Sequence, residues 1–156
     1  MTLDTLVAGY WPGTAEELAG QIHGEPVFVP MDVAQLYIHW AWKFKLRADI
    51  LWGMTRLETA DFHFGGDVTP SQNNPCGLRK PDGSGFYSFP TLADGVKAHC
   101  AHVAWHVFKD HINEWCNVYY DPKHSALHPN DVKILKDLDV WSTKGYAKKV
   151  LVRVNE

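Results

Sequence analysis

The sequence predicts a single, mainly α-helical (α+β) domain that is interrupted by one small lobe. The chain has 156 residues, of which 46% are hydrophobic and 21% charged, and these values are typical of a globular domain. Apolar residues recur at helical spacing in several segments, whereas residues 60–90 are crowded with glycine and proline. No repeat or shift in composition divides the chain. We therefore expect one domain over residues 1–156, with residues 1–30 as an N-terminal lead-in.

The helical segments can be placed by their caps and their apolar periodicity. Thr14 and Glu17 have the spacing of a capping box and predict a short helix over about residues 15–22. Good N-cap residues open the next three helices, namely Asp32, Asp49 and Thr91. The further helical segments that we expect are 32–46, 49–59, 91–109, 111–119, 130–137 and 144–153. A proline-containing loop is expected at 121–129.

The Gly/Pro-rich segment 60–90 predicts a lobe made mostly of loop. The triplet Pro81-Asp82-Gly83 is a strong turn signal, so a short β-hairpin is expected over residues 78–86. Because this lobe follows directly on the helix 49–59, residues at the end of that helix can face it across a cleft.

Composition excludes several classes of partner. There are 15 basic and 18 acidic residues, so the net charge is -3 and the chain offers no strongly basic surface for nucleic acid phosphates. No stretch approaches the roughly 18 apolar residues of a membrane span. The N-terminus MTLDTLVAGYW lacks the basic start and apolar run of a signal peptide. We expect no nucleic acid and no membrane as partner, and synthesis in the cytoplasm.

Glu58 is the most informative single residue. It follows Leu51 by seven positions and Met54 by four, so it shares their apolar helix face. Desolvation and the negative end of the helix dipole both oppose its charge and should raise its pKa. A raised pKa suits a general acid near neutral pH. The alternative is a carboxylate that reaches solvent or pairs with a cation such as Arg56 or Lys80.

Two other chemistries are weaker alternatives. Four histidines follow one another in a helical region, and intervals of three and four residues could chelate a metal: His99, His102, His106 and His111. No glutamate completes an H-E-x-x-H motif, so we expect packing roles and neither metal nor other cofactor. The three cysteines, Cys76, Cys100 and Cys116, are an odd set and are expected to be buried thiols. A Cys–His peptidase using Cys76 is a further alternative.

A combination of motifs resembles a known family. The segments that carry it are Glu58-Thr59, Gly65-Gly66-Asp67-Val68, Gln72-Asn73-Asn74, Phe86, Gly95-Val96-Lys97-Ala98-His99, and Trp141 with Tyr146-Ala147 and Lys149-Val150. Together they resemble the bacterial glucosaminidase domain, the peptidoglycan-cleaving group of glycoside hydrolase family 73, over about residues 31–153. The sequence departs from the family pattern at Ala60, where a glycine is usual, and at Pro75-Cys76, which replaces an aromatic–small pair.

The resemblance implies a lysozyme-like helical lobe and a small loop or hairpin lobe that form a cleft. It makes Glu58 the catalytic acid, which protonates the glycosidic oxygen of a GlcNAc-β-1,4-MurNAc bond. Glycosidases usually need a second group for the oxocarbenium-like transition state. Asp67 is favoured for it over Asp61 and Asp82, with the substrate's 2-acetamido group as the alternative. Tyr146 resembles a catalytic tyrosine that lines the cleft near the acid.

The remaining site residues are expected to bind the sugar. Amide side chains and aromatic rings suit acetamido groups and sugar faces, and the candidates are Asn73, Asn74, Phe62, Phe64 and Phe86. The resemblance implies an endo-β-N-acetylglucosaminidase that acts on the glycan strands of the cell wall, and we expect a monomer. The missing signal peptide fits a phage lysin, a virion-associated enzyme, a protein secreted by another route or an excised domain. The alternatives are a non-catalytic peptidoglycan-binding module and a muramidase- or chitinase-like specificity on the same scaffold.

Overall fold

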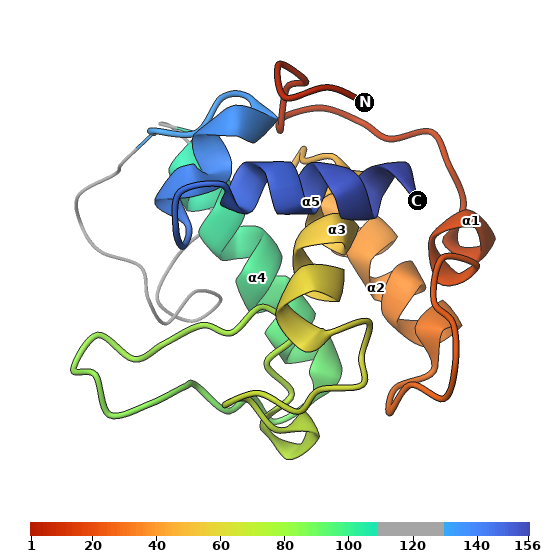
Figure 1. Cartoon of the computed structure of the whole chain (residues 1–156), viewed down its shortest axis with the longest axis vertical. Coiled ribbons are helices and arrows are strands. Elements are labelled where there is room, and N and C mark those ends of the chain that lie inside the picture. The colour runs from red at the N-terminus through yellow and green to blue at the C-terminus, as the bar shows by residue number, and fades with distance from the viewer. Residues whose placement is uncertain (109–129) are drawn as a thin grey trace.

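The computed structural model describes residues 1–108 and 130–156 (Figure 1). The helix expected at 111–119, the loop at 121–129, and with them His111 and Cys116, lie outside the described residues. The described part is mainly helical, as the sequence predicts. Its α-helices are α1 (Ala15–Ala19), α2 (Pro30–Lys43), α3 (Ala48–Thr59), α4 (Leu92–Val107) and α5 (Tyr146–Asn155), and its 3₁₀ helices are η1 (Pro70–Gln72) and η2 (Leu135–Val140).

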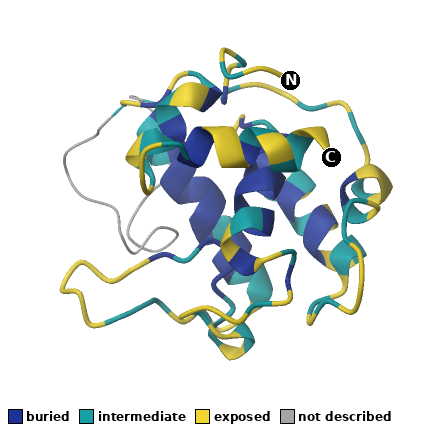
Figure 2. Cartoon of the chain, in the orientation of Figure 1, coloured by how far each residue is buried: buried dark blue, intermediate teal, exposed yellow. Residues whose placement is uncertain are grey.

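Helix α3 lies at the centre of the helical lobe, between α2 and α5 (Figure 1). Nearly its whole length is buried, as the dark ribbon in Figure 2 shows, and Leu51 and Met54 have no exposed surface. Helix α5 crosses it very closely at Gly53, where an added Cβ would lie 2.5 Å from the Cγ2 of Val154. The central helix is therefore fixed by packing on several sides. This packing also fixes the direction in which the side chains of its last turn project.

The helix starts were predicted with mixed success. Thr14 and Thr91 cap α1 and α4 as expected, and the predicted capping box at Thr14 is joined by a second one at Thr91; in each box the hydroxyl accepts a hydrogen bond from a backbone N–H three residues on. The predicted caps Asp32 and Asp49 are wrong by a few positions, because α2 and α3 begin earlier and both aspartates lie in the first turn. Pro30 starts α2, since a proline needs no hydrogen-bond acceptor at that position.

The last two predicted helices have different characters. The segment expected at 130–137 is extended at first and becomes the 3₁₀ helix η2 only from Leu135. The segment expected at 144–153 is helix α5, which starts after Gly145 in the left-handed region with φ of 90°. Trp141 lies between the two helices, so the turn between them carries an aromatic side chain toward the small lobe.

The N-terminal lead-in is tied into the helical lobe rather than detached from it. Val7 is fully buried, and its backbone N–H donates to the carbonyl of Lys133. The backbone N–H of Arg47 donates in turn to the carbonyl of Val7. These bonds join three segments that are distant in the sequence, and they hold the start of α3 and the approach to η2 together.

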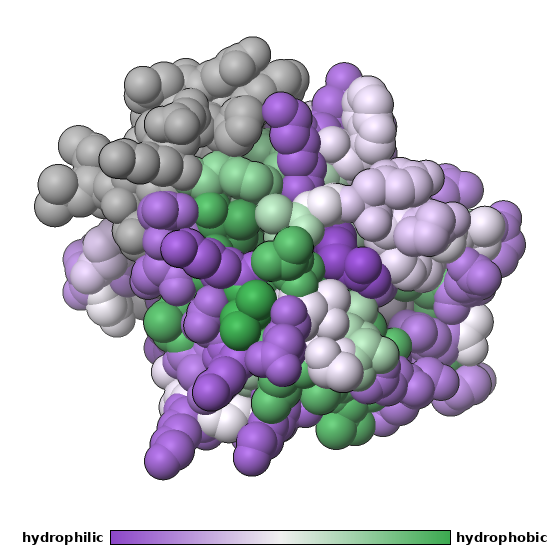
Figure 3. All heavy atoms as spheres, turned by 90° about the horizontal axis from the view of Figure 1, so that it is seen from above, coloured by the Kyte–Doolittle hydropathy of each residue, from purple (hydrophilic) through white to green (hydrophobic). Residues whose placement is uncertain are grey.

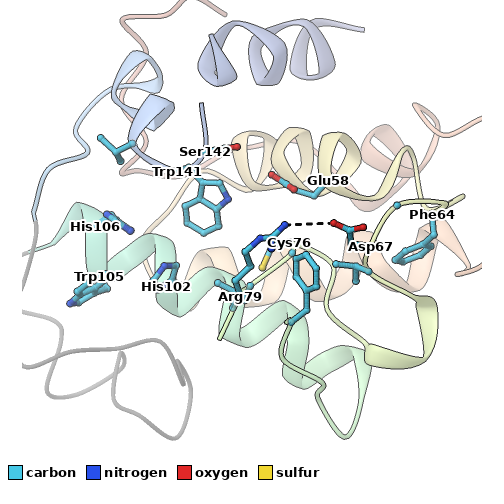
Figure 4. Close-up of a pocket in the computed structure, with 16 residues that line it drawn as sticks. Glu58, Phe64, Asp67, Cys76, Arg79, His102, Trp105, His106, Trp141 and Ser142 are labelled. Carbon is cyan, nitrogen blue, oxygen red and sulfur yellow. Dashed lines mark ion pairs between the residues drawn. The ribbon is translucent and has the colours of Figure 1, made fainter. Parts of the chain in front are cut away.

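The small lobe is loop with a short hairpin, as the sequence predicts. An antiparallel bridge joins Arg79 and Phe86, and the N–H groups of Lys80 and Tyr87 donate to the carbonyls of Gly85 and Leu78 at 2.8 and 2.9 Å. The turn directs the Arg79 side chain back toward the helical lobe (Figure 4).

The outer surface is mixed in character. On the face in Figure 3, hydrophobic residues are interspersed among hydrophilic ones. No helix within residues 1–108 and 130–156 is both long and apolar enough to cross a bilayer.

Candidate active site

A cavity of about 490 Å³ opens between the two lobes (Figure 4). Four segments form its walls: the end of α3, the small lobe that follows it, the second half of α4 and the turn at the end of η2. Its lining residues are Glu58, Phe64, Gly66, Asp67, Val68, Cys76, Gly77, Leu78, Arg79, Phe86, His102, Trp105, His106, Val140, Trp141 and Ser142. The cavity thus has acidic, basic and aromatic groups in one space.

Glu58 opens onto this cavity from the last turn of α3. The apolar face that it shares with Leu51 and Met54 runs from the core to the cavity, so its carboxylate emerges where the buried stripe ends. The small lobe approaches it closely at Gly77, where a Cβ would lie 3.3 Å from Glu58 Oε2. Gly77 also has φ of 65°, in the left-handed region that favours glycine. A bulkier residue there would displace the carboxylate.

The surroundings of Glu58 raise the pKa of its carboxyl. The residue keeps contact with solvent in the cavity, but desolvation by the surrounding walls raises the pKa of its carboxyl above the usual value. A hydrogen-bonding interaction with Tyr146 and the positive charge of Arg79 act in the opposite direction and lower that pKa in part. The net shift is upward, which keeps a proton available to a leaving group at higher pH.

Tyr146 lies behind Glu58 rather than in the cavity wall. It is 4% exposed, and its hydroxyl is buried with no hydrogen-bond partner of good geometry among the described residues. The hydroxyl is nevertheless near enough to Glu58 for each group to affect the other, and burial together with the Glu58 charge raises the Tyr146 pKa far above its ordinary value. The geometry therefore suits a hydroxyl that orients the acid and not one that touches a sugar.

Asp67 lines the same cavity as Glu58 and is held loosely. Its side chain is 80% exposed, and Oδ2 is 3.7 Å from the nearest guanidinium nitrogen of Arg79 (Figure 4). The competing candidates are placed elsewhere. Asp61 pairs with Arg56 and Arg153, and Asp82 caps the hairpin turn by accepting from the Ser84 N–H. Neither Asp61 nor Asp82 lines the cavity.

The structure places Asn73 and Asn74 outside the lining of the cavity, where their amides hold the small lobe together. Asn74 is 1% exposed, and its amide donates to the carbonyls of Leu78 and Tyr87, while its oxygen accepts from the Leu78 N–H. Asn73 donates to the carbonyl of Phe89 and does not line the cavity. Both side chains thus set the shape of the loop that carries Gly77 and Arg79.

The three phenylalanines separate into two groups. Phe64 and Phe86 line the cavity, where each ring offers an apolar surface. The sugar-binding prediction for Phe62 is wrong, because this residue is fully buried against Trp52 with ring centroids 5.3 Å apart. The backbone explains this, since Phe62 has φ of 63° and follows two other residues in the left-handed region, so that its side chain turns back into the core.

The histidines of α4 also have separate environments. His99 is fully buried, its Nδ1 lies 2.8 Å from the Tyr37 hydroxyl, and desolvation with the nearby His102 lowers its pKa to about 3. His102 and His106 line the cavity beside Trp141. No group of three or more His, Cys, Asp or Glu within the described ranges is arranged to hold a metal. Cys76 is 2% exposed.

Sequence reasoning missed part of the cavity wall. Arg79 had no motif to mark it, and only the hairpin brings it next to Asp67. Trp105 is partly buried, lines the cavity and forms a stacked pair with His102 at 5.3 Å. An aromatic residue three positions after a histidine on one helix was a signal that could have found this wall.

Comparison with solved structures identifies the fold. The chain is similar to autolysin E of Staphylococcus aureus in a catalytic mutant, with glutamate replaced by alanine, in complex with the disaccharide NAG-NAM, at TM-score 0.60 and 12% identity. It is also similar to autolysin E in complex with the muropeptide NAM-L-Ala-D-iGlu, at TM-score 0.56 and 13% identity. Each match covers 98% of this chain and 70% of that one. The predicted lysozyme-like fold is confirmed. No protein-family profile and no curated protein sequence matches the chain.

Proposed function

We propose that the chain is a peptidoglycan hydrolase, an endo-β-N-acetylglucosaminidase that cleaves GlcNAc-β-1,4-MurNAc bonds with Glu58 as general acid. One observation carries the proposal: a glutamate with a raised pKa projects from a rigid central helix into an interlobe cavity of about 490 Å³. The shared fold supports it, because a catalytic mutant of autolysin E, with glutamate replaced by alanine, is in complex with the disaccharide NAG-NAM. The glucosaminidase-like motifs of the sequence support it further.

The reaction would use the groups on the cavity wall as follows. A glycan strand lies in the cavity with its sugar faces against Phe64 and Phe86. Glu58 donates its proton to the bridging oxygen, so that the bond to the anomeric carbon breaks and positive charge develops on that sugar. Asp67 is the candidate for the second carboxylate, which activates water or stabilises this charge, and the substrate's acetamido group is the other candidate.

The first prediction is that Glu58→Gln abolishes turnover without loss of folding. The amide keeps the shape of the side chain but cannot donate a proton with comparable ease, and a general acid contributes about 10²–10⁴-fold to rate. We expect the rate of reducing-end release from purified sacculi to fall by at least about 100-fold. The matched control is Glu25→Gln, which makes the same change at an exposed position outside the cavity and should retain full activity.

The reducing ends identify the bond that is cut. A glucosaminidase leaves GlcNAc at the new reducing end, whereas a muramidase leaves MurNAc. A binding module would sediment with sacculi and release no sugar. Full turnover by Glu58→Gln would remove Glu58 from the mechanism even if the wild-type protein releases GlcNAc ends.

A further inference from the structure

One side chain of the cavity has a charge that the proposed mechanism does not use. Among the described residues that line the cavity, Arg79 is the one that carries a permanent positive charge. Its side chain is 63% exposed, and its guanidinium lies over the Phe86 ring with 4.4 Å to the ring centroid. The ring supports the plane of the guanidinium on one side, and this contact pre-orients the donors of the group.

The Arg79 guanidinium can form a stronger ion pair than the one it makes with Asp67. Its contact with Asp67 is 3.7 Å long, whereas charge-assisted hydrogen bonds of this kind are usually about 2.7–2.9 Å. Both side chains are mostly exposed, and such ion pairs contribute little. Arg79 makes no other side-chain hydrogen bond or ion pair with the residues that the structure describes. A ligand carboxylate, which matches the fork of donors, can therefore displace or share the contact with Asp67.

Arg79 is also near the reacting centre. Arg79 and Glu58 line the same cavity from different lobes (Figure 4), so a ligand group bound to Arg79 lies close to the bond that Glu58 would protonate. A chitin strand is neutral and has no carboxylate to place there. The muramic acid of peptidoglycan has one on its lactyl ether when the strand is bare, and its stem peptide supplies carboxylates when the peptide is attached.

We propose that Arg79 is the carboxylate-binding residue of the cavity and selects muramic acid-containing strands over neutral chitin strands. The inference rests on the proposed function and adds to it the group on the substrate that is recognised. A lactyl carboxylate and a stem-peptide carboxylate share the chemistry that Arg79 binds, and a comparison of bare and peptide-bearing strands separates the two sources.

The test measures binding in a Glu58→Gln background, where the strands are not consumed. The second change is Arg79→Gln, and the matched control is Lys80→Gln, which removes the same charge from an exposed neighbour outside the cavity. The ligands are a chitooligosaccharide, bare GlcNAc-MurNAc strands, and the same strands with stem peptides. Arg79→Gln should weaken binding of at least one carboxylate-bearing ligand by about 10-fold or more, and should change chitooligosaccharide binding less than about 3-fold. Lys80→Gln should leave all three ligands unaffected.

The outcomes separate this inference from the proposed function. Loss confined to bare strands identifies the lactyl carboxylate, and loss confined to peptide-bearing strands identifies the stem. An equal loss for all three ligands, or no loss, overturns the inference while leaving the hydrolase proposal intact. Failure of the wild-type protein to cleave any strand overturns the hydrolase proposal instead. Arg79→Lys keeps the charge without the fork and should bind the carboxylate ligands with intermediate strength, which checks that a folding defect does not cause the loss.

Discussion

At the scale of single residues, the environment of Glu58 is a balance of opposing effects. The cavity walls desolvate the carboxyl and raise its pKa, while Tyr146 and Arg79 favour the charged form. Because a general acid works only when protonated, activity should fall as the pH rises through this raised pKa. The alkaline limb of the pH–rate profile should therefore lie above the usual glutamate pKa of about 4.3. The position of that limb thus reports on the neighbours of Glu58.

Tyr146→Phe should move the alkaline limb to higher pH. The variant removes a hydroxyl that lowers the Glu58 pKa, so the acid keeps its proton further into the alkaline range. Stability should be unchanged or slightly raised, since the buried hydroxyl has no hydrogen-bond partner of good geometry in the described part of the chain. The measurements are the pH–rate profile and the melting temperature. Tyr10→Phe is the matched control, because Tyr10 is 67% exposed. A limb that stays in place or moves to lower pH would contradict the coupling.

The sequence could identify Glu58 and some of its neighbours, such as Tyr146, but it misplaced others for reasons visible in particular residues. The position of Glu58 follows from helical periodicity, which extends over several turns. Phe62 depends on three successive backbone angles in the left-handed region, at Ala60, Asp61 and Phe62, and L-residues rarely adopt these angles. Asn73 suits either a turn or a binding site in sequence, and only the fold shows that its amide bonds a backbone carbonyl.

At the scale of elements, the two lobes meet through backbone at Gly95. A Cβ at this position of α4 would lie 1.8 Å from the carbonyl oxygen of Asn73 and 3.0 Å from Cδ of Pro75. The loop that follows η1 therefore lies directly on the first turn of α4. The same loop continues to Gly77, so the contact at Gly95 helps to set the distance between the small lobe and Glu58.

Gly95→Ala should therefore destabilise the protein, although alanine is the better helix former. In an open helix the change would stabilise by about 1 kcal/mol. Here overpacking against backbone should reverse the sign and lower the free energy of unfolding by about 2 kcal/mol. Urea denaturation measures this. Gly66→Ala is the control, because nothing lies within 4 Å of its added Cβ, and its free energy of unfolding should change by less than about 0.5 kcal/mol. A stabilised Gly95→Ala variant would show that the loop can move aside.

The caps show how far sequence reasoning extends at this scale. A cap depends on one or two residues at fixed spacing, and both the predicted capping box at Thr14 and the predicted N-cap at Thr91 are present. Asp32 and Asp49 resemble caps but serve as first-turn carboxylates, since tertiary packing extends α2 and α3 toward their N-termini. The sequence did not identify Arg79 as a cavity residue, because its position depends on the hairpin and on how the two lobes meet.

At the scale of the whole molecule, one buried histidine links folding to pH. His99 is fully buried and neutral, with a pKa lowered to about 3, whereas an unfolded chain binds a proton there near pH 6.5. Between these values the unfolded state holds one more proton. The contribution of His99 is thus fully present above pH 6.5 and is lost progressively as the pH falls toward 3.

Below pH 6.5, the titration of His99 should lower the free energy of unfolding by about 1.4 kcal/mol for each unit by which the pH falls. Urea denaturation at pH 7.5, 5.5 and 4.5 gives the slope, and His99→Gln should make that slope shallower because glutamine does not titrate. An NMR signal from a protonated His99 ring in the folded protein at pH 5 would contradict this account without any variant.

The cavity takes its walls from segments around residues 58, 79, 102 and 141. These segments are synthesised in that order, so the segment around residue 141 is the last of the four to be made. A nascent polypeptide therefore contains Glu58 before the walls of the cavity are complete. Under the proposed function, a product of incomplete synthesis or of proteolysis that lacks the segment around residue 141 has an incomplete cavity and should not cleave a glycan strand.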